Sequence, residues 1–175
     1  LEASEVGENC RQVVAFAYSS VGGMLRNMER YEESVGYVMK AIEYSDTKSK
    51  SDTLGLVNSL THLSNVYSDW GKQDSSYKYA LQALQINRSP LTMFRMANWY
   101  ADNGFPDEAL TLLFEAGDSI NRTQYYHLQG SLHRYLSNCF RLKGEREKAV
   151  ASAEKALALH TQRGDLTYAR IGYTT

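Results

Sequence analysis

Proline, excess charge of either sign and long apolar runs are all scarce in this sequence, and each scarcity excludes a class of protein. Only two prolines occur in 175 residues, 43% of which are hydrophobic, so the composition is that of a folded helical chain rather than a disordered one. The net charge of -1 gives no electrostatic footprint for direct binding of nucleic acid. No apolar run approaches the roughly 20 residues that a membrane-spanning helix requires.

The pattern that is present is a helical hairpin, and its clearest copy is ANWYADNGFPDEALTLLFEA at residues 97–116. Small, apolar and aromatic residues recur there at spacings of three and four on both sides of a break at Gly104 and Pro106. Glycine suits the left-handed position that ends a helix, and proline suits the first turn of the next helix. Neither helix can bury its apolar stripe alone, which predicts that the unit repeats.

The same order of residues recurs four times along the chain. The residue that opens the buried stripe of each second helix is Ser34, Ser76, Ala109 and Ala149, at steps of 42, 33 and 40 residues. Each is preceded by a first-helix pattern of large, small and aromatic positions, in which the small residues are Gly22, Ser64, Ala97 and Ser137. Three of the hairpins have a turn glycine, at Gly71, Gly104 and Gly144, and the first has Glu29 in its place.

This order resembles the tetratricopeptide repeat family, whose repeat is about 34 residues long. The resemblance covers about residues 14–175, although the family's usual proline after the second helix is missing and two spacings are too long. It implies an all-α fold, a right-handed α-α superhelix or solenoid of helical hairpins. The hairpins are expected at about 9–46, 53–88, 89–119 and 123–161. The extra residues, near 47–53 and 121–126, are expected to lengthen helices or loops.

Residues 164–175 match the first helix of a fifth hairpin that has no second helix behind it. A solenoid needs a polar cap on its last apolar face, so this end predicts that the chain is a fragment of a longer protein. The unpaired face also predicts a homodimer through this truncated end. A second hypothesis follows, in which the array is the sensory or regulatory part of a longer bacterial signalling or transcription-regulator protein whose output domain lies outside this fragment.

The resemblance implies a non-catalytic scaffold that binds a protein or peptide segment in the concave groove lined by the first helices. Asn65, Asn98 and Asn138 follow the small residue of successive first helices, and an amide side chain can bond both the C=O and the N–H of an extended peptide. The alternative is that these amides only bond a neighbouring helix. The remaining candidate residues on this face are Thr61, Phe94, Arg134 and Arg141, with Asp102 beside them. The two arginines suit an acidic segment.

No enzyme motif is present in the sequence. The four histidines form no pair at the spacing that places two metal ligands on one helix face, and there is no phosphate-binding loop or nucleophile elbow. We therefore expect no catalytic residue, no metal and no cofactor. His133 and the pair Gly22 and Gly23 are interpreted as packing residues.

The compartment stays open. Cys10 and Cys139 fall in the first and fourth hairpins and belong to no metal-binding pattern, and two isolated thiols favour a reducing, cytoplasmic environment. The sequence starts at Leu1 without a methionine, so removal of an upstream signal or anchor would allow a periplasmic location.

Overall fold

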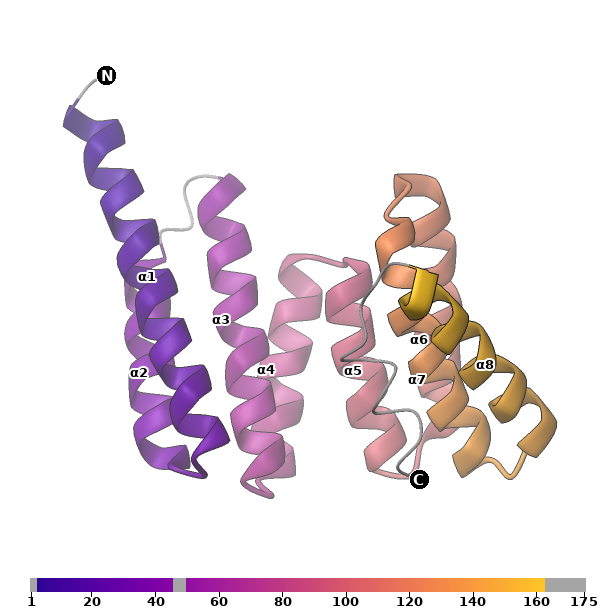
Figure 1. The fold of residues 1–175 in the computed structure, drawn as a ribbon. Coiled ribbons are helices and arrows are strands. Elements are labelled where there is room, and N and C mark those ends of the chain that lie inside the picture. The colour runs from indigo at the N-terminus through magenta and orange to yellow at the C-terminus, as the bar shows by residue number, and fades with distance from the viewer. Residues whose placement is uncertain (1–2, 46–49, 163–175) are drawn as a thin grey trace. The chain divides into compact units, whose positions relative to one another are not determined.

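The computed structural model describes residues 3–45 and 50–162, and every long regular element within these ranges is an α-helix (Figure 1). None of these helices is both long and apolar enough to cross a membrane. The elements are α1 (Ala3–Asn27), α2 (Tyr31–Tyr44), α3 (Lys50–Asp69), α4 (Gln73–Ile86), α5 (Pro90–Asp102), α6 (Pro106–Thr123), the short 3-10 helix η1 (Tyr126–Leu128), α7 (Gln129–Leu142) and α8 (Arg146–Gln162).

The chain divides into two compact units, Leu1–Arg88 and Ser89–Thr175. Unit 1 contains the hairpins α1–α2 and α3–α4, and unit 2 contains α5–α6 and α7–α8. In unit 1 the first helices, α1 and α3, pack side by side, and in unit 2 α5 packs beside α7 in the same way. The second helices make no comparable contact with each other in the described ranges. The first helices therefore line the inner side of each unit.

All four hairpins close with the same turn. Its first residue has a left-handed backbone, with φ of 60° at Glu29, 75° at Gly71, 86° at Gly104 and 75° at Gly144. The N–H of the following residue donates to the carbonyl five positions back, as in Arg30 to Leu25 at 3.0 Å. This is the Schellman arrangement that satisfies the last carbonyls of a helix. Glu29 takes the position that glycine takes elsewhere, as the alignment of the hairpins predicts.

The two helices of a hairpin cross at small residues twelve positions apart. In three hairpins a serine hydroxyl donates to the backbone carbonyl of the opposite helix: Ser34 Oγ to Gly22 O at 2.7 Å, Ser76 Oγ to Ser64 O at 3.0 Å, and Ser137 Oγ to Ala149 O at 2.9 Å. In the remaining hairpin the equivalent residues are Ala97 and Ala109, which are fully buried. The small positions of the sequence pattern are therefore the points where the helix backbones approach most closely.

Several helix ends differ from the sequence prediction. α1 begins at Ala3, six residues before the predicted start of the first hairpin, and α3 begins at Lys50 rather than near residue 53. α6 continues past residue 119 to Thr123 and ends at Gln124, which has a φ of 58°. The long spacings between hairpins thus extend α3 and α6. The predicted fifth hairpin at 164–175, and the dimer face assigned to it, lie outside the described residues.

Candidate peptide-binding face

The inner face of unit 1 carries two of the predicted binding residues, Thr61 and Asn65, both on α3 and both half-buried. The hydroxyl of Thr61 donates to the carbonyl of Val57 at 2.8 Å within the same helix. The Asn65 amide makes no side-chain hydrogen bond in the part of the chain that the structure describes. Asn65 therefore keeps its full hydrogen-bonding capacity, whereas the only proton of the Thr61 hydroxyl is already donated.

The inner face of unit 2 carries two polar pairs, one on α5 and one on α7. Asn98 Nδ2 donates to Asp102 Oδ2 at 2.7 Å, one turn along α5. Arg141 Nη2 donates to Asn138 Oδ1 at 2.8 Å on α7. Both asparagines bond residues of their own helix. The alternative, in which these amides bond a neighbouring helix, is therefore not what the structure shows for Asn98 and Asn138. Each amide still has hydrogen-bonding groups available: the Oδ1 acceptor of Asn98, and the two N–H donors of Asn138.

The pKa shifts of this region link Asp102 on α5 with Cys139 on α7. Burial raises the pKa of Asp102, and the hydrogen bond from Asn98 and the positive charge of Arg95 oppose that rise. Burial likewise raises the pKa of Cys139 on α7 to about 11, and the negative charge of Asp102 adds to this rise. Asp102 on α5 thus lies near enough to influence Cys139 on α7, which follows Asn138 in the sequence.

Phe94 does not lie on the surface, contrary to its selection as a binding residue. Its side chain is only 3% exposed, and its ring packs against that of Tyr135 with 5.2 Å between the ring centroids. The guanidinium of Arg134 lies 4.2 Å from the centroid of the same Tyr135 ring, in a cation–π contact. Phe94 therefore supports Tyr135, which in turn supports Arg134. Tyr135 was not among the residues predicted for this face, because it falls between the helical stripes. Its position next to Arg134 in the sequence was the one feature that could have indicated its role.

The arginines of α7 have no carboxylate partner among the described residues. Arg134 is half-buried and its Nε atom has no hydrogen-bond acceptor. Arg141 is exposed and bonds only the neutral amide of Asn138. Since guanidinium groups bind carboxylates well, this part of the inner face is suited to a negatively charged group. Asn65 belongs to the other unit, so the continuous row of three asparagines stays a prediction.

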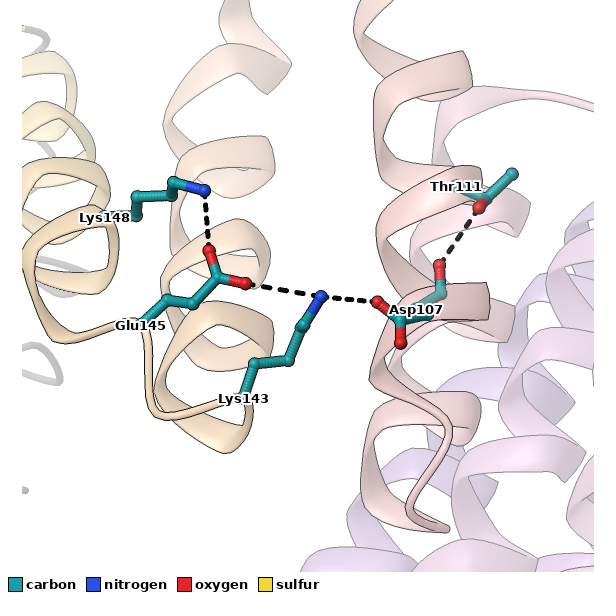
Figure 2. Close-up of polar contacts among 5 residues, drawn as sticks. All are labelled: Asp107, Thr111, Lys143, Glu145 and Lys148. Carbon is teal, nitrogen blue, oxygen red and sulfur yellow. Dashed lines mark hydrogen bonds and ion pairs between the residues drawn. The ribbon is translucent and has the colours of Figure 1, made fainter.

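A hollow of about 520 Å³ lies in unit 2 between α6 and the turn that joins α7 to α8. Its apolar lining comes from Leu110, Phe114 and Phe140. A chain of ion pairs runs along its rim (Figure 2): Lys143 Nζ lies 2.6 Å from Asp107 Oδ1 and 3.3 Å from Glu145 Oε1, and Lys148 Nζ lies 2.7 Å from Glu145 Oε2.

These rim charges neutralise one another. Hydrogen bonds from Lys148 and Lys143 lower the pKa of Glu145, and bonds to Asp107 and Glu145 raise the pKa of Lys143. These ion pairs therefore link the turn between α7 and α8 to the start of α6. Their two positive and two negative charges balance, so they leave no net charge for a ligand. These ion pairs were not predicted from the sequence, although Asp107 and Lys143 are 36 residues apart, close to one repeat length.

The described residues contain no group of three or more His, Cys, Asp or Glu side chains that could hold a metal ion. His133 is half-buried, and burial, together with the charge of Lys155, lowers its pKa. Gly22 is a packing residue, since its Cα faces Val38 across the hairpin crossing. Gly23 has open space around it, so the packing interpretation holds for the first glycine of the pair and not for the second.

Comparison with known proteins supports the repeat pattern. Two family models described as tetratricopeptide repeat match the chain, at residues 57–90 and 133–167. No curated protein matches it significantly.

Solved structures with similar folds include the nearly identical repeats of a protein described as a kinesin light chain of Podosopora anserina, with a TM-score of 0.65 at 15% identity over 83% of this chain and 74% of that one. BtubC (BKLC) of P. vanneervenii has a TM-score of 0.66 at 13% identity over 99% of this chain and 89% of that one. The C-terminal domain of a FK506-binding protein of Plasmodium falciparum has a TM-score of 0.55 at 15% identity, over 80% and 95%. These likenesses concern the fold alone. The predicted fold class, an all-α superhelix of helical hairpins, is confirmed.

Proposed function

Because this chain belongs to the tetratricopeptide repeat family, we propose that it is a non-catalytic scaffold that binds an extended, acidic protein or peptide segment on the inner face of unit 2. The observation that carries this proposal is the pair of arginines on α7, Arg134 and Arg141, which have no carboxylate partner in the described chain. A guanidinium that is held in place and lacks a carboxylate is a ready site for one.

The amides beside the arginines would bind the backbone of such a segment. Asn98 offers its oxygen to a peptide N–H, and Asn138 offers its two N–H groups to a peptide carbonyl. Each neutral hydrogen bond of this kind contributes about 0.5–1.5 kcal/mol net, and each bond to a charged group about 1.5–3 kcal/mol. The arginines therefore dominate the affinity, and the amides hold the segment in register.

Asp102 gives the proposed site a direction. Its carboxylate lies on the α5 side of the face, whereas both arginines lie on α7. An acidic residue of the segment would be repelled near Asp102 and attracted near Arg141, because like charges that face each other across an interface cost free energy. The acidic part of the segment is therefore placed along α7, and a neutral or basic part along α5.

The test is selection of peptides from a random library displayed on phage, with the folded chain as bait, followed by calorimetry on the selected peptides. We expect the selected sequences to be enriched in Asp and Glu, and the double variant R134A/R141A to bind them at least tenfold more weakly. Arg146→Ala, an exposed arginine at the start of α8, is the matched control and leaves the affinity unchanged.

Two results would contradict the proposal: selected peptides without acidic residues, or acidic peptides that bind R134A/R141A as tightly as the unchanged chain. The variants N98A/N138A and Asn65→Ala separate the parts of the face. Loss of affinity in the first alone would confine the site to unit 2, and loss in both would extend it to α3. No observation on the described helices favours the alternative of a sensory domain.

A further inference from the structure

The outer side of α1 is an apolar stripe that nothing in the described chain covers. Val13, Phe16, Met24 and Met28 are 67%, 74%, 62% and 64% exposed, and Val21 is 37% exposed. These side chains lie opposite Ala15, Ser19 and Gly22, through which α1 packs on its own unit. α1 stands at the edge of unit 1 (Figure 1), so this side of the helix is directed away from α2 and α3.

The stripe is wide and it carries no charge. Ala17 and Ser20 lie between the larger side chains, and the only charged residue between Val13 and Met28 is Arg26, which pairs with Asp69 of α3 at 2.8 Å. A surface helix of a globular protein has such a stripe where it faces a core. Exposed apolar patches of this extent mark sites of protein association.

The area is sufficient for association with a second copy. At about 150–200 Å² for a large side chain, the exposed fractions correspond to roughly 500 Å² of apolar surface on each copy. Two copies that pack through this stripe would bury about 1,000 Å², which is the lower bound for a specific interface. A weak dimer, sensitive to single substitutions, is what such an area supports.

The order of side chains along α1 is also complementary to itself when two copies run antiparallel. A twofold axis between Ser20 and Val21 places Val13 opposite Met28 of the second copy, and Ala17 opposite Met24. The large side chain of Met24 then meets the small one of Ala17, and within the stripe from Val13 to Met28 no like charges are brought together. We propose that the outer face of α1 is a homodimer interface in which two copies of this chain pack antiparallel through this stripe.

The proposal is independent of the peptide site, which is in the other unit, and it is tested by mass measurement in solution. Light scattering after size-exclusion chromatography should give twice the chain mass of 19.8 kDa at high concentration and approach the monomer mass on dilution. Val13→Glu and Phe16→Glu should each shift the dissociation constant upward by at least tenfold. Val150→Glu on α8, whose wild-type valine is 57% exposed, is the matched control and leaves the dimer intact. Circular dichroism checks that every variant is folded.

Disulfide trapping tests the antiparallel pairing. With Cys10 replaced by serine, a mixture of the Ala17→Cys and Met24→Cys chains should yield a cross-linked heterodimer on mild oxidation, and neither chain alone should cross-link as fully. A monomer mass at every concentration would overturn the proposal. So would a dimer that survives both Val13→Glu and Phe16→Glu, because association would then use another surface.

Discussion

Gly22 and Gly23 are adjacent glycines in the middle of α1, and replacing each by alanine should change stability in opposite directions. A Cβ atom at Gly22 would lie 2.5 Å from Cγ2 of Val38 and 3.3 Å from the backbone oxygen of Ser34. A Cβ atom at Gly23 would meet no atom within 4 Å. The two substitutions are chemically identical and lie in the same helix, so they differ only in packing.

The magnitudes follow from these distances. Alanine in place of glycine in a helix interior stabilises it by about 0.5–1 kcal/mol, and this gain applies at both positions. At Gly22 the gain is opposed by overpacking, which costs about 1–3 kcal/mol when the neighbours have to move. Val38 is fully buried and β-branched, so rotation of its side chain gives little relief. We therefore expect Gly22→Ala to destabilise unit 1 by about 1–2 kcal/mol and Gly23→Ala to stabilise it by about 0.5–1 kcal/mol.

Tryptophan fluorescence isolates the unit concerned. Trp70 belongs to unit 1 and Trp99 to unit 2, so the substitution Trp99→Phe leaves Trp70 as the reporter of unit 1. Trp70 lies at the end of α3, stacked on Tyr67 and Tyr31, and its emission will change when these contacts are lost. In urea, a slope of about 2 kcal/mol per M converts the expected change for Gly22→Ala into a midpoint lower by about 0.5–1 M. If Gly22→Ala were as stable as Gly23→Ala, the close approach at the hairpin crossing would not exist.

Three further changes test the turn, the thiols and the carboxyl of Asp102. Glu29→Gly should stabilise the first hairpin by about 1 kcal/mol in urea unfolding, because a left-handed backbone costs a residue with a Cβ atom about 1–2 kcal/mol; an unchanged midpoint would contradict this. A thiol reagent at neutral pH should modify exposed Cys10 and spare Cys139, which is buried and has a pKa of about 11, until denaturant is added. Burial raises the folded pKa of Asp102, so the contribution of this carboxyl to stability falls as the pH rises above the unfolded pKa of about 3.9 and through the folded pKa. Asp102→Asn should therefore be modestly more stable than the wild type at pH 7 and no different below that pKa, and a variant that is less stable at pH 7 would refute the assignment.

The fold was predictable because its determinants are local in the sequence. The crossing of Ser34 with Gly22 spans twelve residues, and the turn at Gly71 is closed by a hydrogen bond from Lys72 to Tyr67. Both features recur with the same residue types in successive hairpins, so the alignment of small positions and turn glycines was enough to place them. Even the exception was informative, because Glu29 adopts the left-handed backbone of the glycines with which it was aligned.

The candidate site was only partly predictable, because its side chains depend on neighbours that the repeat pattern does not specify. Asn98 and Asn138 occupy equivalent positions, yet one donates to a carboxylate and the other accepts from a guanidinium. The difference comes from Asp102 and Arg141, which lie outside the shared pattern. Phe94 was taken as a surface residue because of its register on the helix, but Tyr135 from the adjacent helix covers it.

Stability and binding are consequently assigned to different residues of the same helices. The small residues at the hairpin crossings and the buried aliphatic residues hold each unit together, whereas Arg134 and Arg141 take part in no ion pair of the described chain. Substitution of exposed residues away from buried networks changes stability by only about 0.5 kcal/mol. Replacing Arg141 should therefore leave the hairpins folded, and Arg134→Ala should cost only its packing on Tyr135. A loss of peptide binding in R134A/R141A would then report on recognition, because the scaffold that presents the arginines does not depend on them.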